Sequence, residues 1–140
     1  YITYSGFRIL KESVFNLLDQ VDHDKIDHVI SILNKNRSEN WIDIHNLRII
    51  KFGDKIHIDC HTTIPWYFNA NEVHDELKLV EENIKDIIPN NLETFIHADP
   101  CHPKSCKSCN KQDCKVRQFT FEQKIEWTLE NVMKNEKHFL

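Results

Sequence analysis

The sequence predicts an α+β sandwich in which helices cover one face of a three-stranded sheet. Between residues 21 and 100, two segments carry apolar residues at helical spacing, two neighbouring segments alternate around a Gly-Asp turn, and a third alternating segment ends at Pro100. In chain order they read helix, strand, strand, helix, strand, which is typical of a split βαβ arrangement. The second face of such a sheet stays open to a partner or a ligand.

Two helical segments are expected before the first strand. Residues 1–19 carry apolar side chains at helical spacing and read as a helical lead-in. Asp22 is a candidate N-cap for the next helix, which ends in the polar residues 34–40. The apolar stripe of that helix follows the i, i+3, i+4, i+7 pattern and consists of Ile26, Val29, Ile30 and Leu33.

Residues 41–52 and 55–64 are expected to pair as a hairpin across the turn Gly53-Asp54. Successive side chains of a strand point to opposite faces of the sheet. In the second strand the face expected in the core carries Ile56, Ile58, Cys60, Thr62 and Ile64. The opposite face carries His57, Asp59, His61 and Thr63. Cys60 is therefore predicted to be a small core residue and no ligand.

The clearest helix follows Pro65, with Asn69 or Asn71 as its N-cap, and stops before Pro89. Its apolar stripe is Val73, Leu77, Val80, Ile84 and Ile87. The third strand covers residues 92–99, with His97 and Asp99 on one face and Ile96 on the other.

After Cys101 the composition changes abruptly to Cys, Lys, Ser and Asn, and a domain boundary is expected there. The predicted divisions are 1–20 as a linker, 21–100 as the folded domain, and 101–140 as a cysteine-rich extension with a terminal amphipathic helix. Thr120-x-x-Gln123 has the form of a capping box for that helix, ahead of Ile125, Leu129, Val132 and Met133.

Composition excludes several classes of function. The net charge of −4 comes with scattered basic residues, so nucleic acid is not an expected partner. The chain has no Gly-rich phosphate loop, no G-x-S-x-G and no H-E-x-x-H, so no enzymatic activity is expected. Five cysteines with only 2 glycines do not fit a secreted disulfide scaffold and favour metal-binding thiols in a reducing compartment.

The first candidate metal site lies on the predicted strands. His45, His61, His97 and Asp99 each belong to one of them, and His97 and Asp99 share a face because they are two residues apart. Imidazole and carboxylate are ligands of zinc and similar divalent transition metals. His74 on the helix after Pro65 and Asp59 are possible additions.

The second candidate site is the run Cys101-x4-Cys106-x2-Cys109-x4-Cys114, with His102 beside it. Four thiols in a short loop predict a tetrahedral zinc site. The lysines of this loop are expected to lower the pKa values of the thiols. The first three cysteines also match a plant-type iron–sulfur spacing, but there the fourth normally lies far downstream, so a cluster ranks lower. The third interpretation of this cysteine run is a flexible tail whose cysteines are free thiols.

With these residues in view, the stretch from about Tyr4 to Cys101 resembles the end of a cation diffusion facilitator, a family of cation efflux transporters. Ser5-Gly6-Phe7 resembles the junction after the last membrane helix, and Phe52-Gly53-Asp54 resembles the family's turn. The segments that resemble its strands and helix are His45-Asn46-Leu47-Arg48, His57 to His61, Val73-His74 with Val80-Glu81, and the closing His97-Ala98-Asp99-Pro100.

The resemblance implies a ferredoxin-like, metallochaperone-like domain that forms a homodimer on the cytoplasmic face of the inner membrane, beneath its own transmembrane domain. It implies that His45, His61, His97 and Asp99 are metal ligands and that His74 completes a site from the other subunit. The full-length protein would then exchange a divalent cation, expected to be zinc, for protons. The segment after Cys101 has no counterpart in the family's pattern.

Two alternatives remain open at this point. One is a stand-alone metal-binding or sensing protein of the same fold. The other is an electron carrier that holds an iron–sulfur cluster through the cysteines.

Overall fold

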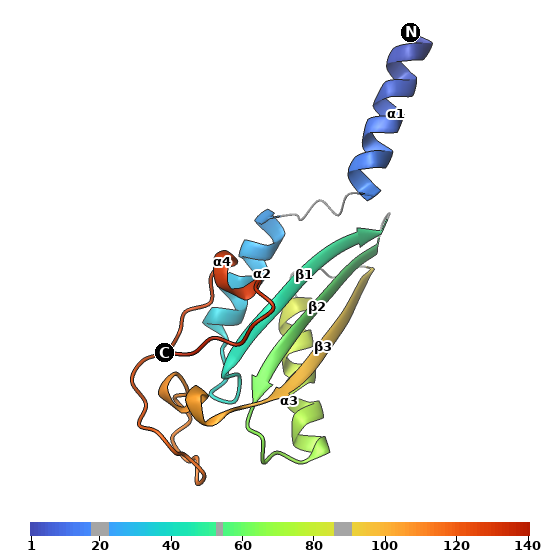
Figure 1. The fold of residues 1–140 in the computed structure, drawn as a ribbon. Coiled ribbons are helices and arrows are strands. Elements are labelled where there is room, and N and C mark those ends of the chain that lie inside the picture. The colour runs from blue at the N-terminus through green and yellow to red at the C-terminus, as the bar shows by residue number, and fades with distance from the viewer. Residues whose placement is uncertain (18–22, 53–54, 86–90) are drawn as a thin grey trace.

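The fold was analysed in a computed structural model that describes residues 1–17, 23–52, 55–85 and 91–140 (Figure 1). The elements are α1 (Ile2–Leu17), α2 (His23–Lys35), β1 (Asp43–Phe52), β2 (Lys55–Ile64), α3 (Ala70–Lys85), β3 (Leu92–Pro100), the 3₁₀ helix η1 (Pro103–Lys107) and α4 (Leu129–Val132). The predicted α+β sandwich and its α-β-β-α-β order are confirmed. The predicted turn at Gly53-Asp54 and the predicted stripe residue Ile87 lie outside the described residues.

The sheet has the order β1-β2-β3, with β1 antiparallel and β3 parallel to the central strand β2. Because β2 and β3 are direct neighbours, the βαβ unit is not split, and that part of the prediction is wrong. The outer edge of β1 is partly occupied by the C-terminal segment, where the backbone N–H of Asn46 donates to the carbonyl of Lys134 at 2.8 Å. Strand β3 instead pairs with the edge of β2 that β1 does not occupy.

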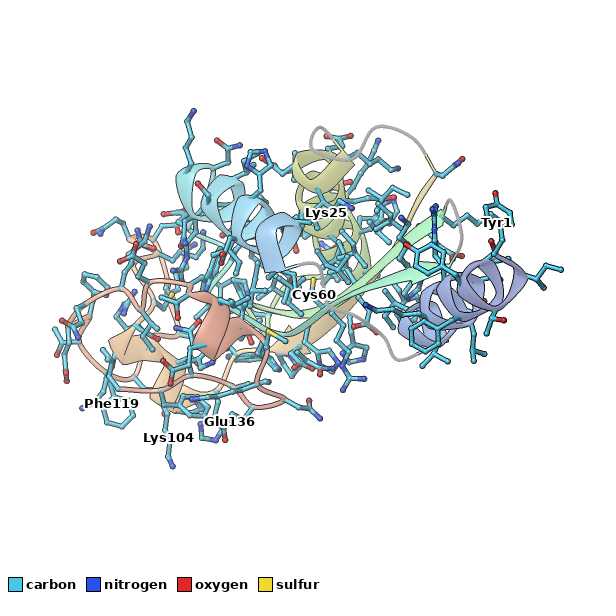
Figure 2. The ribbon with its side chains drawn as sticks, turned by 90° about the horizontal axis from the view of Figure 1, so that it is seen from above. Tyr1, Lys25, Cys60, Lys104, Phe119 and Glu136 are labelled. Atoms are coloured by element: carbon cyan, nitrogen blue, oxygen red, sulfur yellow. The ribbon has the colours of Figure 1, made fainter. Side chains whose placement is uncertain are left out.

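The core lies between the sheet and the two helices α2 and α3, which contact each other (Figure 1). It contains the whole predicted stripe of α2, Val80 and Ile84 of the predicted stripe of α3, and the predicted inward residues Ile58 and Cys60 of β2. Val73 and Leu77 of the α3 stripe are only partly buried and lie outside this core. Cys60 is only 1% exposed, as predicted for a core residue. Figure 2 shows it at the centre of the molecule, far from Lys104 and Phe119 at the periphery.

The C-terminal segment differs from the prediction. No helix begins at Thr120; the chain is irregular until α4, a four-residue helix that Thr128 caps. Tertiary partners satisfy the backbone here: Arg37 donates to the carbonyl of Ile125 at 2.6 Å, and Asn34 donates to that of Trp127 at 2.7 Å. Because those carbonyls already accept hydrogen bonds from the domain, they do not need the hydrogen bonds that a helix would provide. The segment packs into the same core through buried Trp127 and through Val132.

The first helix, α1, extends away from the sandwich (Figure 1). Its apolar side chains are largely exposed, with Phe7 at 66% and Leu10 at 60%. Among the described residues, no helix has both the length and the apolar character needed to cross a membrane.

Candidate metal centre

The strand register places three histidines in one row across the sheet. His45 of β1 pairs with His61 of β2, and His61 pairs in turn with His97 of β3. Residues that pair directly project their side chains from the same face. The ring centroids lie 5.2 Å apart for His45 and His61, and 4.8 Å apart for His61 and His97. This row lies on the opposite side of the strands from the core residues Ile58 and Cys60, since side chains alternate along β2.

Asp99, near the end of β3, is the carboxylate that all three histidines approach. Its Oδ2 lies 3.2 Å from Nε2 of His45 and 3.4 Å from Nδ1 of His61, and its Oδ1 lies 3.3 Å from Nδ1 of His97. The ligand atoms of His45, His61 and Asp99 all lie within 4.8 Å of one another. Among the described residues, this is the group of three potential ligands that is close enough to hold a single ion.

The three histidines differ in burial. The His45 side chain is 4% exposed, His61 is 31% exposed and His97, on the edge strand, is 56% exposed. The buried Nδ1 of His45 has no hydrogen-bond partner, although the carboxylate of Asp43 lies 3.3 Å away. The row therefore runs from a buried histidine to one that solvent or another molecule can reach.

Asp43, which lies beside His45, also forms an ion pair with His138. Nδ1 of His138 lies 2.7 Å from Asp43, and Nε2 lies 3.0 Å from the carbonyl of Asn131. Because both ring nitrogens face acceptors, the ring is best satisfied as an imidazolium. The hydrogen bond with Asp43 raises the pKa of His138. Burial opposes ionisation of Asp43, but the hydrogen bonds from His138 and the nearby ring of His45 prevail and lower its pKa to about 2.

Lys137, in the C-terminal segment, lies beside the carboxylate of Asp99. Nζ of Lys137 lies 3.7 Å from Oδ2 of Asp99 and donates to the carbonyl of Pro100 at 2.8 Å. Burial works to raise the pKa of Asp99, but the charge of Lys137 and a hydrogen bond with His61 leave it below its usual value. The protein thus supplies a cation next to the carboxylate that a metal ion would use.

His97 contacts Asp99 but is not one of the three close ligand residues, and two further predicted ligands lie outside this group as well. His74 is exposed on α3, beside a hollow that it shares with Glu81 and Thr94, on the helix-covered side of the sheet. Asp59 pairs across the sheet with Arg48, beyond the bulge that follows His45. Neither belongs to the close group around Asp99 within one chain.

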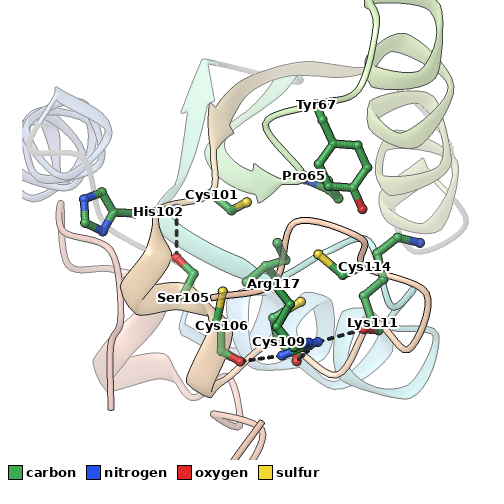
Figure 3. Close-up of a pocket in the computed structure, with 11 residues that line it drawn as sticks. Pro65, Tyr67, Cys101, His102, Ser105, Cys106, Cys109, Lys111, Cys114 and Arg117 are labelled. Carbon is green, nitrogen blue, oxygen red and sulfur yellow. Dashed lines mark hydrogen bonds between the residues drawn. The ribbon is translucent and has the colours of Figure 1, made fainter. Parts of the chain in front are cut away.

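The four cysteines of the second candidate site line one cavity, together with His102 (Figure 3). All four are free thiols. Nδ1 of His102 accepts the backbone N–H of Lys104 at 3.3 Å and caps η1. The expectation that the lysines lower the thiol pKa values is wrong for Cys101 and Cys109, because burial raises the pKa of both.

Sequence reasoning missed Asp43, Lys137 and His138 at the first site. His138 lies near the end of the sequence, yet its side chain is only 11% exposed. Asp43 stands two residues before His45 on the same strand, so strand alternation alone could have placed it on the same face. No local pattern links residues 137 and 138 to a strand 95 positions earlier in the chain.

Comparison with known proteins finds a matching family model and similar solved structures. The family model described as "Cation efflux protein, cytoplasmic domain" matches residues 21–101. The metal-bound C-terminal domain of the CzcD transporter from Thermotoga maritima is 19% identical, with a TM-score of 0.49, over 56% of this chain and 90% of that one. A structure described as "Mode of Action of a Putative Zinc Transporter CzrB (Zn form)" is 16% identical with a TM-score of 0.53, over 59% of this chain and 91% of that one. No curated protein matches.

Proposed function

Because the chain belongs to the cation efflux protein family, as the cytoplasmic domain of such a transporter, we propose that it binds zinc and dimerises to regulate metal efflux. The observation that carries this proposal is the meeting of His45, His61 and Asp99 from three different strands. A rigid sheet that presents imidazole and carboxylate groups at this spacing has the ligand chemistry of a site for a zinc-like ion.

The distances support that reading. Two ligands about 2.0 Å from a tetrahedral ion lie roughly 3.3 Å apart. The two histidine nitrogens stand 3.2 and 3.4 Å from the Asp99 oxygen, which is close to that spacing. His97 is the exposed fourth candidate, and His74 of a second copy is the candidate ligand from across the dimer. Asp43 orients the buried ring of His45 from its other side, as outer-shell carboxylates do for metal-bound histidines.

Regulation requires that the ion bind one arrangement of the dimer more tightly than the other. Ligands from both copies provide this difference, since a site completed across the interface exists only when the copies are close. The full-length transporter would sit with this domain on the cytoplasmic face of the membrane. Its membrane helices would carry out the transport as an exchange of the divalent cation for protons, and this domain alone would transport nothing.

The test is a zinc titration of residues 1–140 in competition with a chromophoric chelator. Asp99→Asn and His61→Ala should each weaken one class of bound zinc by about 10- to 100-fold or more, because both remove a ligand. His57→Ala is the matched control, as it removes an imidazole from the same face of β2 that contacts Glu93 instead. Equal zinc binding by all four proteins would contradict the proposal.

A further inference from the structure

A second set of potential ligands lies in what we call the cysteine loop, residues 101–117. Its four thiols come from the residue after β3, from η1 and from the turns that follow, and all of them line one cavity (Figure 3). They are Cys101, Cys106, Cys109 and Cys114. The family model ends at residue 101, so this loop lies almost wholly beyond the match.

The cysteine loop has little apolar material with which to stabilise its own shape. Its buried residues are two serines, Cys109 and one lysine, at positions 105, 108, 109 and 111. Short loops of this composition usually depend on a covalent or metal cross-link. The loop nevertheless places its four sulfur-bearing side chains around one cavity. A metal ion bound in that cavity would supply the cohesion that apolar side chains do not.

Arg117 holds the backbone around the cavity. Its guanidinium donates to the carbonyls of Cys106 at 2.9 Å, Cys109 at 2.9 Å and Lys111 at 2.7 Å. Those three carbonyl oxygens are thereby already engaged by the guanidinium. The charge of Arg117 also works to lower the pKa of Cys109, against the effect of burial.

We propose that the cysteine loop binds one soft divalent cation, Zn²⁺ or Cd²⁺, through these four sulfurs. Each thiol gives up its proton to solvent as its sulfur coordinates, so the loaded site carries a formal charge of about −2. Arg117 and Lys111 line the cavity and offset that charge. Binding draws the four sulfurs together, because without an ion they do not form the close group seen around Asp99.

The cysteine loop also anchors the segment that returns to the sheet. The backbone N–H of Glu122 donates to the carbonyl of Lys107 at 2.8 Å, and their side chains form an ion pair at 2.9 Å. From there the chain runs on to Lys137 and His138 beside the first site. An ion in the loop therefore fixes the start of the segment that supplies those two residues.

Cobalt binding to residues 1–140, purified anaerobically, tests the proposal without any mutation. Thiolates around Co²⁺ give an intense sulfur-to-metal charge-transfer band, which histidine and carboxylate ligands do not give. We expect this band to saturate at about one ion per chain and to disappear when Zn²⁺ is added. Absence of the charge-transfer band with all thiols reduced would overturn the proposal. So would brown protein with acid-labile sulfide, or a loop isolated with its cysteines as disulfides.

Variants separate this site from the first one. Cys106→Ser with Cys109→Ser should abolish the charge-transfer band and lower bound zinc by about one ion per chain. Cys60→Ala is the matched control, since Cys60 is a buried core thiol outside the cavity, and it should leave the band unchanged. His61→Ala should also leave the band intact, so failure of the histidine site and failure of the thiol site give different results. Loss of the band in His61→Ala would contradict two independent sites.

Discussion

At the scale of single residues, the ion pair between Asp43 and His138 predicts a pH-dependent stability. The pKa of His138 is raised, so the pair stabilises the fold fully below about pH 6.5 and loses its effect as the pH rises through the raised value. The pKa of Asp43 is about 2, so its contribution is present above about pH 4 and is lost as the pH falls toward 2. With chelator present, His138→Ala should cost about 2 kcal/mol at pH 5 and much less at pH 9.

Denaturant unfolding at several pH values measures this cost. The control is His57→Ala, whose partner Glu93 is 76% exposed and whose removal should change stability little at any pH. A cost for His138→Ala that is the same at pH 5 and pH 9 would show that the residue contributes by packing and not by charge.

Single residues of the first site were predictable to different degrees. Strand alternation placed His97 and Asp99 on one face of their strand, and His61 on the face of its strand opposite the core, because the period of a strand is two residues. Their alignment in one row depends on the register of the strands, which residue spacing does not specify. Lys137 and His138 were not predictable, since nothing local in the sequence says where an irregular segment folds back.

At the scale of elements, the C-terminal segment is part of the folded core. Trp127 is 2% exposed, and the guanidinium of Arg37 lies 3.8 Å from the centre of its ring. Trp127→Ala should therefore lower the free energy of unfolding by about 3 to 5 kcal/mol, through lost burial and a cavity. Phe121→Ala, at a site 40% exposed in the same segment, should cost less than about 0.5 kcal/mol. Equal effects in urea unfolding would mean that the segment does not pack as described.

Prediction succeeded for elements whose backbone hydrogen bonds are local or between neighbouring strands, and failed where distant partners replace them. The hairpin follows from apolar periodicity. Helix α3 follows from apolar periodicity and from capping by Asn69, whose side chain accepts hydrogen bonds from the backbone N–H groups of Asn71 and Glu72. The apolar residues after Thr120 have the spacing of a helix, yet Asn34 and Arg37 bind the carbonyls of that stretch. The pairing of β3 with β2 likewise depends on a distant partner, because the C-terminal segment occupies part of the outer edge of β1.

At the scale of the whole molecule, the sandwich presents two surfaces with different chemistry. One face of the sheet is buried under α2 and α3, and the other carries the histidine row with the C-terminal segment beside it. We propose that a second copy of the chain covers the exposed end of this row at His97. The cysteine loop lies next to it in sequence, since Cys101 follows Asp99 by two positions.

The measurement that tests this account most directly is the zinc content per chain of residues 1–140, together with the mass in solution before and after chelation. The account predicts zinc at about one ion per chain or more, and a dimer that dissociates or weakens when the chelator removes it. A metal-free monomer whose mass does not change when zinc is added would contradict it.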